Sequence, residues 1–174
     1  MSQDKAYTMP TIRLETLIRA DINTCFDLSR SIELHKLSTV KTRETAVAGT
    51  VSGLIGMGGS VTWRATHFGI RQQLTSKITA FERPFHFRDE QQQGAFKYMV
   101  HDHYFEELGG RVSMRDVFTF RSPGGLPGRL FDRLVLTRYL TRFLTGRNDL
   151  IRAYAEQIQD GGKDYTGLLP SALS

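Results

Sequence analysis

Apolar and polar residues alternate along most of the chain between residues 11 and 121, which is the pattern of half-buried β-strands. In the first segment, residues 11–20, apolar Ile12 and Leu14 alternate with charged Arg13 and Glu15. Six further segments follow the same pattern with glycine or proline between them, at residues 43–51, 60–68, 70–82, 85–90, 95–108 and 111–121. The pattern predicts seven strands, the last six of them consecutive and antiparallel.

Two parts of the chain have helical spacing instead. After the first strand, Asp21 or Asn23 can cap a helix, and the apolar positions that follow suit two short helices. After a loop at residues 122–128, residues 129–159 lack proline and carry an apolar stripe at Leu136, Leu140, Phe143, Ile151, Tyr154 and Ile158. We predict one long C-terminal helix that buries this stripe, with Gly146 as the position where it could kink or divide.

These elements predict an α+β fold in which a curved seven-stranded antiparallel sheet wraps around the long C-terminal helix. The chain has 174 residues, 40% of them apolar, which suits one domain with a core. We assign that domain to residues 11–159 and expect flexible ends at 1–10 and 160–174. The chain has one cysteine, no long apolar run and no signal-like N-terminus. We therefore expect a cytoplasmic protein without integral membrane association.

The pair Gly109 and Gly110 is the strongest turn signal, because both positions of a type I′ hairpin turn have positive φ. Counting outward from this turn pairs Leu108 with Arg111, Phe105 with Met114, His103 with Asp116 and His101 with Phe118. One face of the hairpin therefore carries histidine, carboxylate, aromatic and sulfur side chains, at Met99, His101, His103, Phe105, Met114, Asp116, Phe118 and Phe120. We expect this face to look toward the helix.

A histidine and a carboxylate on an inward face perturb each other's pKa and can serve acid–base catalysis or ligand anchoring. The alternative is a hydrogen-bonded pair that only fixes the sheet register. Our candidates for chemistry are His103, Asp116, His101 and His67, the last of which shares a strand face with Trp63. His86 is a weaker candidate for the same face.

A metal site would need His67, His101, His103 and Asp116 to converge, and no longer ligand motif supports it, so we predict neither a metal nor a cofactor. In the helix, Arg147 falls inside the apolar stripe. We interpret it as snorkelling to the rim of a cavity, and the alternative is a fixed cation for a ligand carboxylate or for Asp116.

The net charge is +5, and six arginines lie between residues 123 and 158, at Arg129, Arg133, Arg138, Arg142, Arg147 and Arg152. This excess could favour an acidic protein or an anionic membrane, although a solvated helix face explains it more simply. No nucleic-acid-binding motif accompanies the charge, so we predict no nucleic-acid partner.

The order of elements resembles the SRPBCC superfamily, the helix-grip fold of START domains and Bet v 1-like proteins. The closest likeness lies at residues 61–69, 78–84, 101–105 and 130–148, which look like a bacterial branch labelled polyketide cyclase-like or cell-division-inhibitor-like. We transfer no activity from those labels. The resemblance implies a cavity between sheet and helix that accepts an apolar or amphipathic small molecule.

The leading hypothesis is therefore a binding protein, monomeric or homodimeric, for a lipid or polyketide-like molecule. We expect its ligand to contact Trp63, His67, Met99, His101, His103, Phe105, Met114, Asp116, Phe118, Leu140, Phe143 and Arg147. One alternative is a cyclase- or hydrolase-like enzyme with a cavity histidine or aspartate as general acid or base. Another is an interaction module that uses the basic helix face.

Overall fold

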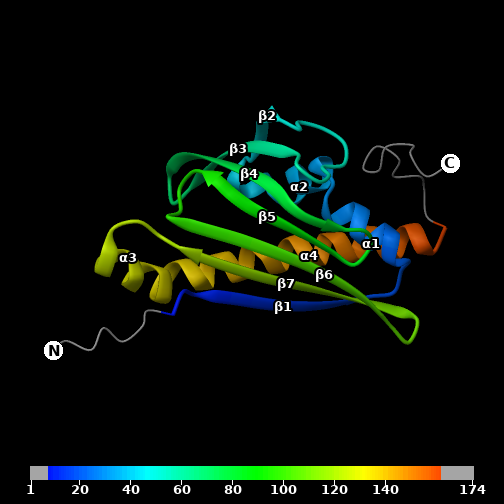
Figure 1. Cartoon of the computed structure of the whole chain (residues 1–174). Helices are drawn as coiled ribbons and strands as arrows, with labels where there is room; N and C mark the ends of the chain where they lie inside the picture. The colour runs from blue at the N-terminus through cyan, green and yellow to red at the C-terminus, as the bar shows by residue number, and fades with distance from the viewer. Residues whose placement is uncertain (1–7, 162–174) are drawn as a thin grey trace.

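A seven-stranded antiparallel sheet forms the largest part of the structure, a computed structural model that describes residues 8–161 (Figure 1). Its strand order is β1-β7-β6-β5-β4-β3-β2. The strands are β1 (Thr11–Ile18), β2 (Thr45–Gly49), β3 (Ser60–His67), β4 (Ile70–Glu82), β5 (His86–Gln93), β6 (Tyr98–Leu108) and β7 (Arg111–Arg121). The predicted strand number and pairing are confirmed. The two ends that were predicted to be flexible, residues 1–10 and 160–174, lie mostly outside the described residues.

The strand bounds differ from the prediction mainly at β2 and β5. Edge strand β2 is shorter than the predicted 43–51, because its register shifts between Ala46 and Ala48 and Arg43 adopts a left-handed backbone conformation. Strand β5 continues three residues beyond the predicted 85–90, to Gln93. The hairpin of β6 and β7 has the predicted register along its whole length, from Leu108 opposite Arg111 onward.

Helices cover one face of the sheet. Helices α1 (Ile22–Ser29) and α2 (Ile32–Ser38) follow β1, and Asp21 caps α1 by accepting hydrogen bonds from the backbone N–H groups of Asn23 and Thr24. A 3₁₀ turn, η1 (Val40–Thr42), leads into β2. The long helix α4 (Thr137–Gln159) runs along the sheet, with α1 near its C-terminal end (Figure 1). Within residues 8–161, no helix is long and apolar enough to cross a membrane.

The C-terminal helical region begins earlier than predicted. Residues 125–128, expected to be a loop, belong to helix α3 (Gly125–Phe131), which continues through a π-helical segment, η2 (Asp132–Leu136), into α4. Pro127 is tolerated because it lies in the first helical turn, where its missing N–H costs no intrahelical bond. The irregularity thus lies at Asp132–Leu136, and the helix is continuous through Gly146.

Two apolar clusters form the core. In the first, the buried ring of Phe26 on α1 contacts Phe81, Phe87 and Phe105 edge to face, at centroid distances of 5.3, 5.4 and 5.3 Å. Cys25 is buried in the same cluster, which is usual for a cysteine without activating neighbours. Burial raises the pKa of its thiol to about 12. The second cluster joins Ile12, Met99, Phe118, Phe120, Leu136, Leu140 and Leu144.

Two glycine substitutions test this description of the backbone. A Cβ at Gly146 would meet no atom within 4 Å, so Gly146→Ala should raise the free energy of unfolding by about 0.5–1 kcal/mol. Gly110 has φ +80° in the hairpin turn, so Gly110→Ala should lower it by about 1 kcal/mol, although space is open there too. Urea unfolding measures both, and a destabilised Gly146→Ala would indicate a break in α4.

Candidate functional site

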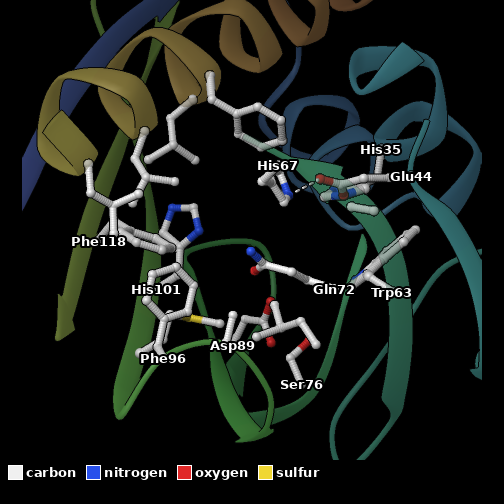
Figure 2. Close-up of a pocket in the computed structure, with 18 of the residues that line it drawn as sticks. His35, Glu44, Trp63, His67, Gln72, Ser76, Asp89, Phe96, His101 and Phe118 are labelled. Atoms are coloured by element: carbon white, nitrogen blue, oxygen red, sulfur yellow. Dashed lines mark hydrogen bonds and ion pairs between the residues drawn. The ribbon is translucent and has the colours of Figure 1, made fainter. Parts of the chain in front are cut away.

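A pocket of about 790 Å³ lies between the sheet and the helical region. Most of its lining is apolar, but several polar side chains project into it, and Figure 2 shows Gln72, Ser76, Asp89 and His101 around its open centre. Pockets of this size and composition are typical of small-molecule sites. The predicted ligand contacts that line it are Trp63, His67, Met99, His101, His103, Phe118, Leu140, Phe143 and Arg147.

Three of the predicted ligand contacts do not line the pocket. Phe105 and Met114 are buried in the first core cluster, where α1 covers the inner face of β6 and β7. They share a sheet face with the pocket residues, as predicted, but lie farther along it. Asp116 is 1% exposed and lies behind the pocket-lining histidines.

Asp116 is the centre of a buried polar network. His101 Nε2 lies 2.7 Å from Asp116 Oδ1, and His103 Nδ1 lies 2.9 Å from the same oxygen. Asn148 of α4 donates a hydrogen bond of 2.6 Å from Nδ2 to the other carboxylate oxygen. The network thus connects β6, β7 and α4, and the expected opposition of His103 and Asp116 is confirmed.

The charge state of this network follows from burial and hydrogen bonding. Burial alone would raise the pKa of Asp116, but contacts with His101 and His103 hold it well below its usual value. Burial lowers the pKa of His103 to about 3, assisted by repulsion from His101 and Arg147 and opposed by Asp116. His103 is therefore neutral, because desolvation exceeds the attraction of the carboxylate. An anionic Asp116 can accept a hydrogen bond from His101 Nε2, which leaves His101 Nδ1 as an acceptor.

The sequence interpretation that Arg147 snorkels to the rim of the cavity is wrong. The side chain is buried, and Nη2 donates a hydrogen bond to the backbone carbonyl of Ser29 at the end of α1. Its Nη1 has no hydrogen-bond partner among residues 8–161, and Arg147 is one of the residues that line the pocket. Burial lowers the pKa of Arg147, and the nearby carboxyl groups of Asp116 and Asp89 oppose this shift. Our alternative, a fixed cation, fits this placement.

Asp89 and Ser76 add polar groups to the pocket wall that the sequence analysis missed. The register of β5 and β6 places Asp89 opposite His101, so both side chains face the pocket. The Ser76 and Asp89 side chains lie close enough to interact with each other, but within the described residues neither Asp89 Oδ1 nor Ser76 Oγ makes a well-aligned hydrogen bond. Burial raises the pKa of Asp89, which favours its neutral form. Buried polar atoms without partners are unusual, and a bound molecule is one means of satisfying them.

A second polar group lies elsewhere on the pocket wall, around Glu44 (Figure 2). His35 Nε2 lies 2.7 Å from Glu44 Oε2, and His67 Nε2 lies 3.5 Å from Oε1. His67 Nδ1 also makes a 2.7 Å hydrogen bond with the Tyr139 hydroxyl, and the His35 ring stacks on Trp63. Burial by itself would raise the pKa of Glu44, but the two imidazoles lower it to about 2.

The four candidate residues therefore do not converge on one point. His101, His103 and Asp116 offer ligand atoms within 4.8 Å of one another, close enough to hold a metal ion, but His67 belongs to the Glu44 group. The Asp116 carboxylate already receives Asn148 and His101, so a hydrogen-bonded network accounts for its geometry. His86 lies on the opposite sheet face, contrary to our assignment, where it stacks on Tyr104 and bonds Asp102.

The protonation state of His103 is testable by NMR. Its ring resonances should stay at their neutral positions from pH 8 to about pH 4.5, whereas in urea-unfolded protein they should titrate near the ordinary pKa of 6.5. Because the unfolded chain then binds a proton that the folded chain does not, this residue's contribution to stability is full above pH 6.5. It is lost as the pH falls toward 3, by at most about 1.4 kcal/mol per pH unit. A His103 that titrates near pH 6.5 in the folded protein would contradict the network.

Comparisons with known proteins place the fold. No family model matches the chain, and no curated protein matches its sequence. A START superfamily protein from Mycobacterium smegmatis has a similar structure, with 10% identity, 85% of this chain and 98% of that chain covered, and a TM-score of 0.64.

Two further solved structures agree. Major latex-like protein 151 from Panax ginseng has 16% identity, coverage of 84% and 97%, and a TM-score of 0.61. A protein from Thermus thermophilus has 17% identity, coverage of 84% and 99%, and a TM-score of 0.66. The chain has the helix-grip fold of START and Bet v 1-like proteins, as its sequence predicted.

Proposed function

We propose that this protein binds an apolar or amphipathic small molecule, of a lipid or polyketide-like kind, in the pocket between the sheet and α4. The observation that carries the proposal is an apolar pocket of about 790 Å³ whose wall holds buried polar atoms without partners. Burial of an apolar ligand there supplies affinity, and the polar atoms supply orientation. Likeness of fold supports the existence of such a space and names no ligand.

The polar atoms restrict the chemistry of the ligand. Arg147 Nη1 is a donor without an acceptor, and protonation of Asp89, which burial favours, lets that side chain donate as well as accept. Asp116, by contrast, already receives its donors from protein side chains. A ligand oxygen, of a carbonyl or a carboxylate, fits beside Arg147 better than a cationic group does, because a cation would meet the buried guanidinium.

Filling the pocket should abolish binding. Ala65 lines it from β3, so Ala65→Phe places a ring in the open space, and we expect affinity for a naphthyl ketone dye to fall at least about tenfold. Fluorescence titration measures the affinity and the stoichiometry, which should be one dye per chain.

The matched control is Thr66→Phe, on the exposed face of the same strand, which should leave dye affinity unchanged. Arg147→Met should keep the dye bound but change its emission, because the carbonyl loses a hydrogen-bond donor. Thermal unfolding verifies that each variant is folded. Equal affinity in Ala65→Phe and wild type would place the dye outside the pocket and refute the proposal.

A second candidate function is general base catalysis on the bound molecule, and the 2.7 Å contact between His101 and Asp116 favours it. The carboxylate can orient the imidazole and stabilise the imidazolium that forms when His101 takes a proton, a role that neutral, deeply buried His103 fills less well. His101 is therefore a better candidate base than His103.

If the pocket is catalytic, His101→Gln should lower turnover of an aromatic ester at least about a hundredfold while dye affinity stays within about threefold. His86→Gln, on the outer sheet face, is the matched control and should retain full turnover. Turnover that is absent from wild type, or that survives in His101→Gln, would leave ligand binding as the function of this pocket.

A further inference from the structure

Large apolar side chains are exposed around the start of the C-terminal helical region. Leu126, Leu130, Leu134 and Phe131 project from α3 and η2, and Phe68 and Ile70 project from the β3–β4 hairpin. Leu126, Leu134 and Ile70 are 75%, 64% and 62% exposed. We call these six residues the mouth patch. A soluble monomer rarely leaves so many large apolar groups together in water unless they contact something.

The mouth patch is one surface. The Phe68 ring lies 5.7 Å from the Phe131 ring and 4.7 Å from the Tyr139 ring, so the hairpin and the helical region are in contact there. Phe68 also has φ +52°, a conformation that disfavours a bulky residue. A solvent-exposed phenylalanine held at a strained turn position contributes little to the core, which points to a role at the surface.

The pocket opens at this patch. Phe68, Ile70 and Phe131 belong both to the mouth patch and to the pocket lining. The lining also includes Pro123 and Gly124, which connect β7 to α3. Figure 1 shows α3 at one end of the molecule, away from α1. An apolar molecule could therefore pass between the pocket and whatever covers the patch without crossing water.

Positive charge borders the mouth patch. Leu126, Leu130 and Leu134 recur every four residues, and Arg138 and Arg142 continue that series along α4, with Arg133 beside it. All three arginines are exposed, and within residues 8–161 none of them has an ion-pair partner. The only acidic residue between 121 and 148, Asp132, is buried. By contrast, exposed Arg152 is paired with Asp149.

We propose that the mouth patch docks on an anionic lipid bilayer, with its apolar side chains among the headgroups and first acyl carbons and Arg133, Arg138 and Arg142 against lipid phosphates. Exposed apolar groups flanked by arginines are the pattern of helices that lie in a membrane interface. The arginines select an anionic surface, and the apolar side chains provide burial. This inference does not require that the pocket bind a ligand.

Vesicle flotation tests the proposal with the full chain. Wild type should float with vesicles of phosphatidylcholine containing about 30% phosphatidylglycerol, and binding should weaken with salt and be far lower on pure phosphatidylcholine. Leu130→Glu with Leu134→Glu should reduce binding at least about tenfold. The control is Leu108→Glu, which replaces an exposed leucine outside the mouth patch, at the β6–β7 turn, and should bind like wild type.

The arginines have their own test. Replacing Arg133, Arg138 and Arg142 with Gln should lower affinity for anionic vesicles about tenfold or more, and Arg152→Gln should not. Circular dichroism confirms folding, which these exposed positions should not disturb. The proposal is overturned if wild type does not float with anionic vesicles at low salt, or if the control variants lose as much binding as the others.

A mouth patch that instead joins two copies of the chain would give dimers in sedimentation, dissociated by the Leu130 and Leu134 substitutions, and no vesicle binding. That result would also overturn the proposal. Dye titration of the same variants in buffer separates the two functions, because substitutions at these exposed leucines should leave the pocket's own affinity unchanged. Failure of one measurement therefore does not imply failure of the other.

Discussion

The buried carboxylate of Asp116 constrains the rest of the structure, because an anion that is 1% exposed is tolerable only when donors surround it. The hydrogen bonds come from different elements, from His101 on β6 and from Asn148 on α4, and the His103 ring lies 2.9 Å from the same carboxylate. Asn148 is the one that reaches across from helix to sheet, so it holds α4 at a fixed distance from β7. Removing a donor would leave the charge partly unpaired, which costs more than the hydrogen bond itself contributes. The sheet and helix are thus joined by a polar contact in a region where apolar packing alone does not fill the space.

The inner face of the sheet is consequently packed against side chains at one end and lines a pocket at the other. Under α1, Phe26 fills the space with three edge-to-face contacts, and Phe105 and Met114 are part of a solid core. Beyond the Asp116 network the rings of Tyr139 and Phe143 on α4 lie against His67 and do not fill the space, and the same strands line a pocket. Arg147 lies near the boundary, where its hydrogen bond to the Ser29 carbonyl satisfies the end of α1. The boundary is therefore polar on both sides, and buried atoms of Asp89, His103, Arg147 and Asn148 that lack a hydrogen-bond partner within the described residues lie around it.

Local patterns were sufficient to predict the strands, the long helix and the hairpin register, because alternation and a two-glycine turn are properties of adjacent residues. The phase of β5 was harder, because residues 94–97 do not form a two-residue turn from which the β5–β6 register could be counted, and His86, opposite Tyr104, lies on the outer face. Helical spacing placed Arg147 on the inner face correctly, but could not say whether that face met solid packing, solvent or a pocket. Glu44 and Asp89 gave no sequence signal, because the first meets His35 and His67 only through the fold and the second faces the pocket only through the register of β5 and β6. Asn148 could have been found, because it follows Leu144 by one turn on the buried stripe.

The two proposals together constrain how a ligand would move. The polar end of the pocket, at Arg147, lies 13 residues beyond Leu134 along the helix, or about 20 Å at 1.5 Å per residue. The mouth patch is apolar at the opposite end, and the Glu44 group near it is already satisfied by His35 and His67. An amphipathic molecule would therefore be bound with its oxygen-bearing end deep and its hydrocarbon toward the mouth. In a bilayer the polar end of such a molecule faces the headgroups, where a docked mouth patch would meet it first. The polar end would then lead into the pocket, and the hydrocarbon would follow through Phe68, Ile70 and Phe131 without exposure to water. The order of polar and apolar groups along the pocket thus matches their order across a membrane surface.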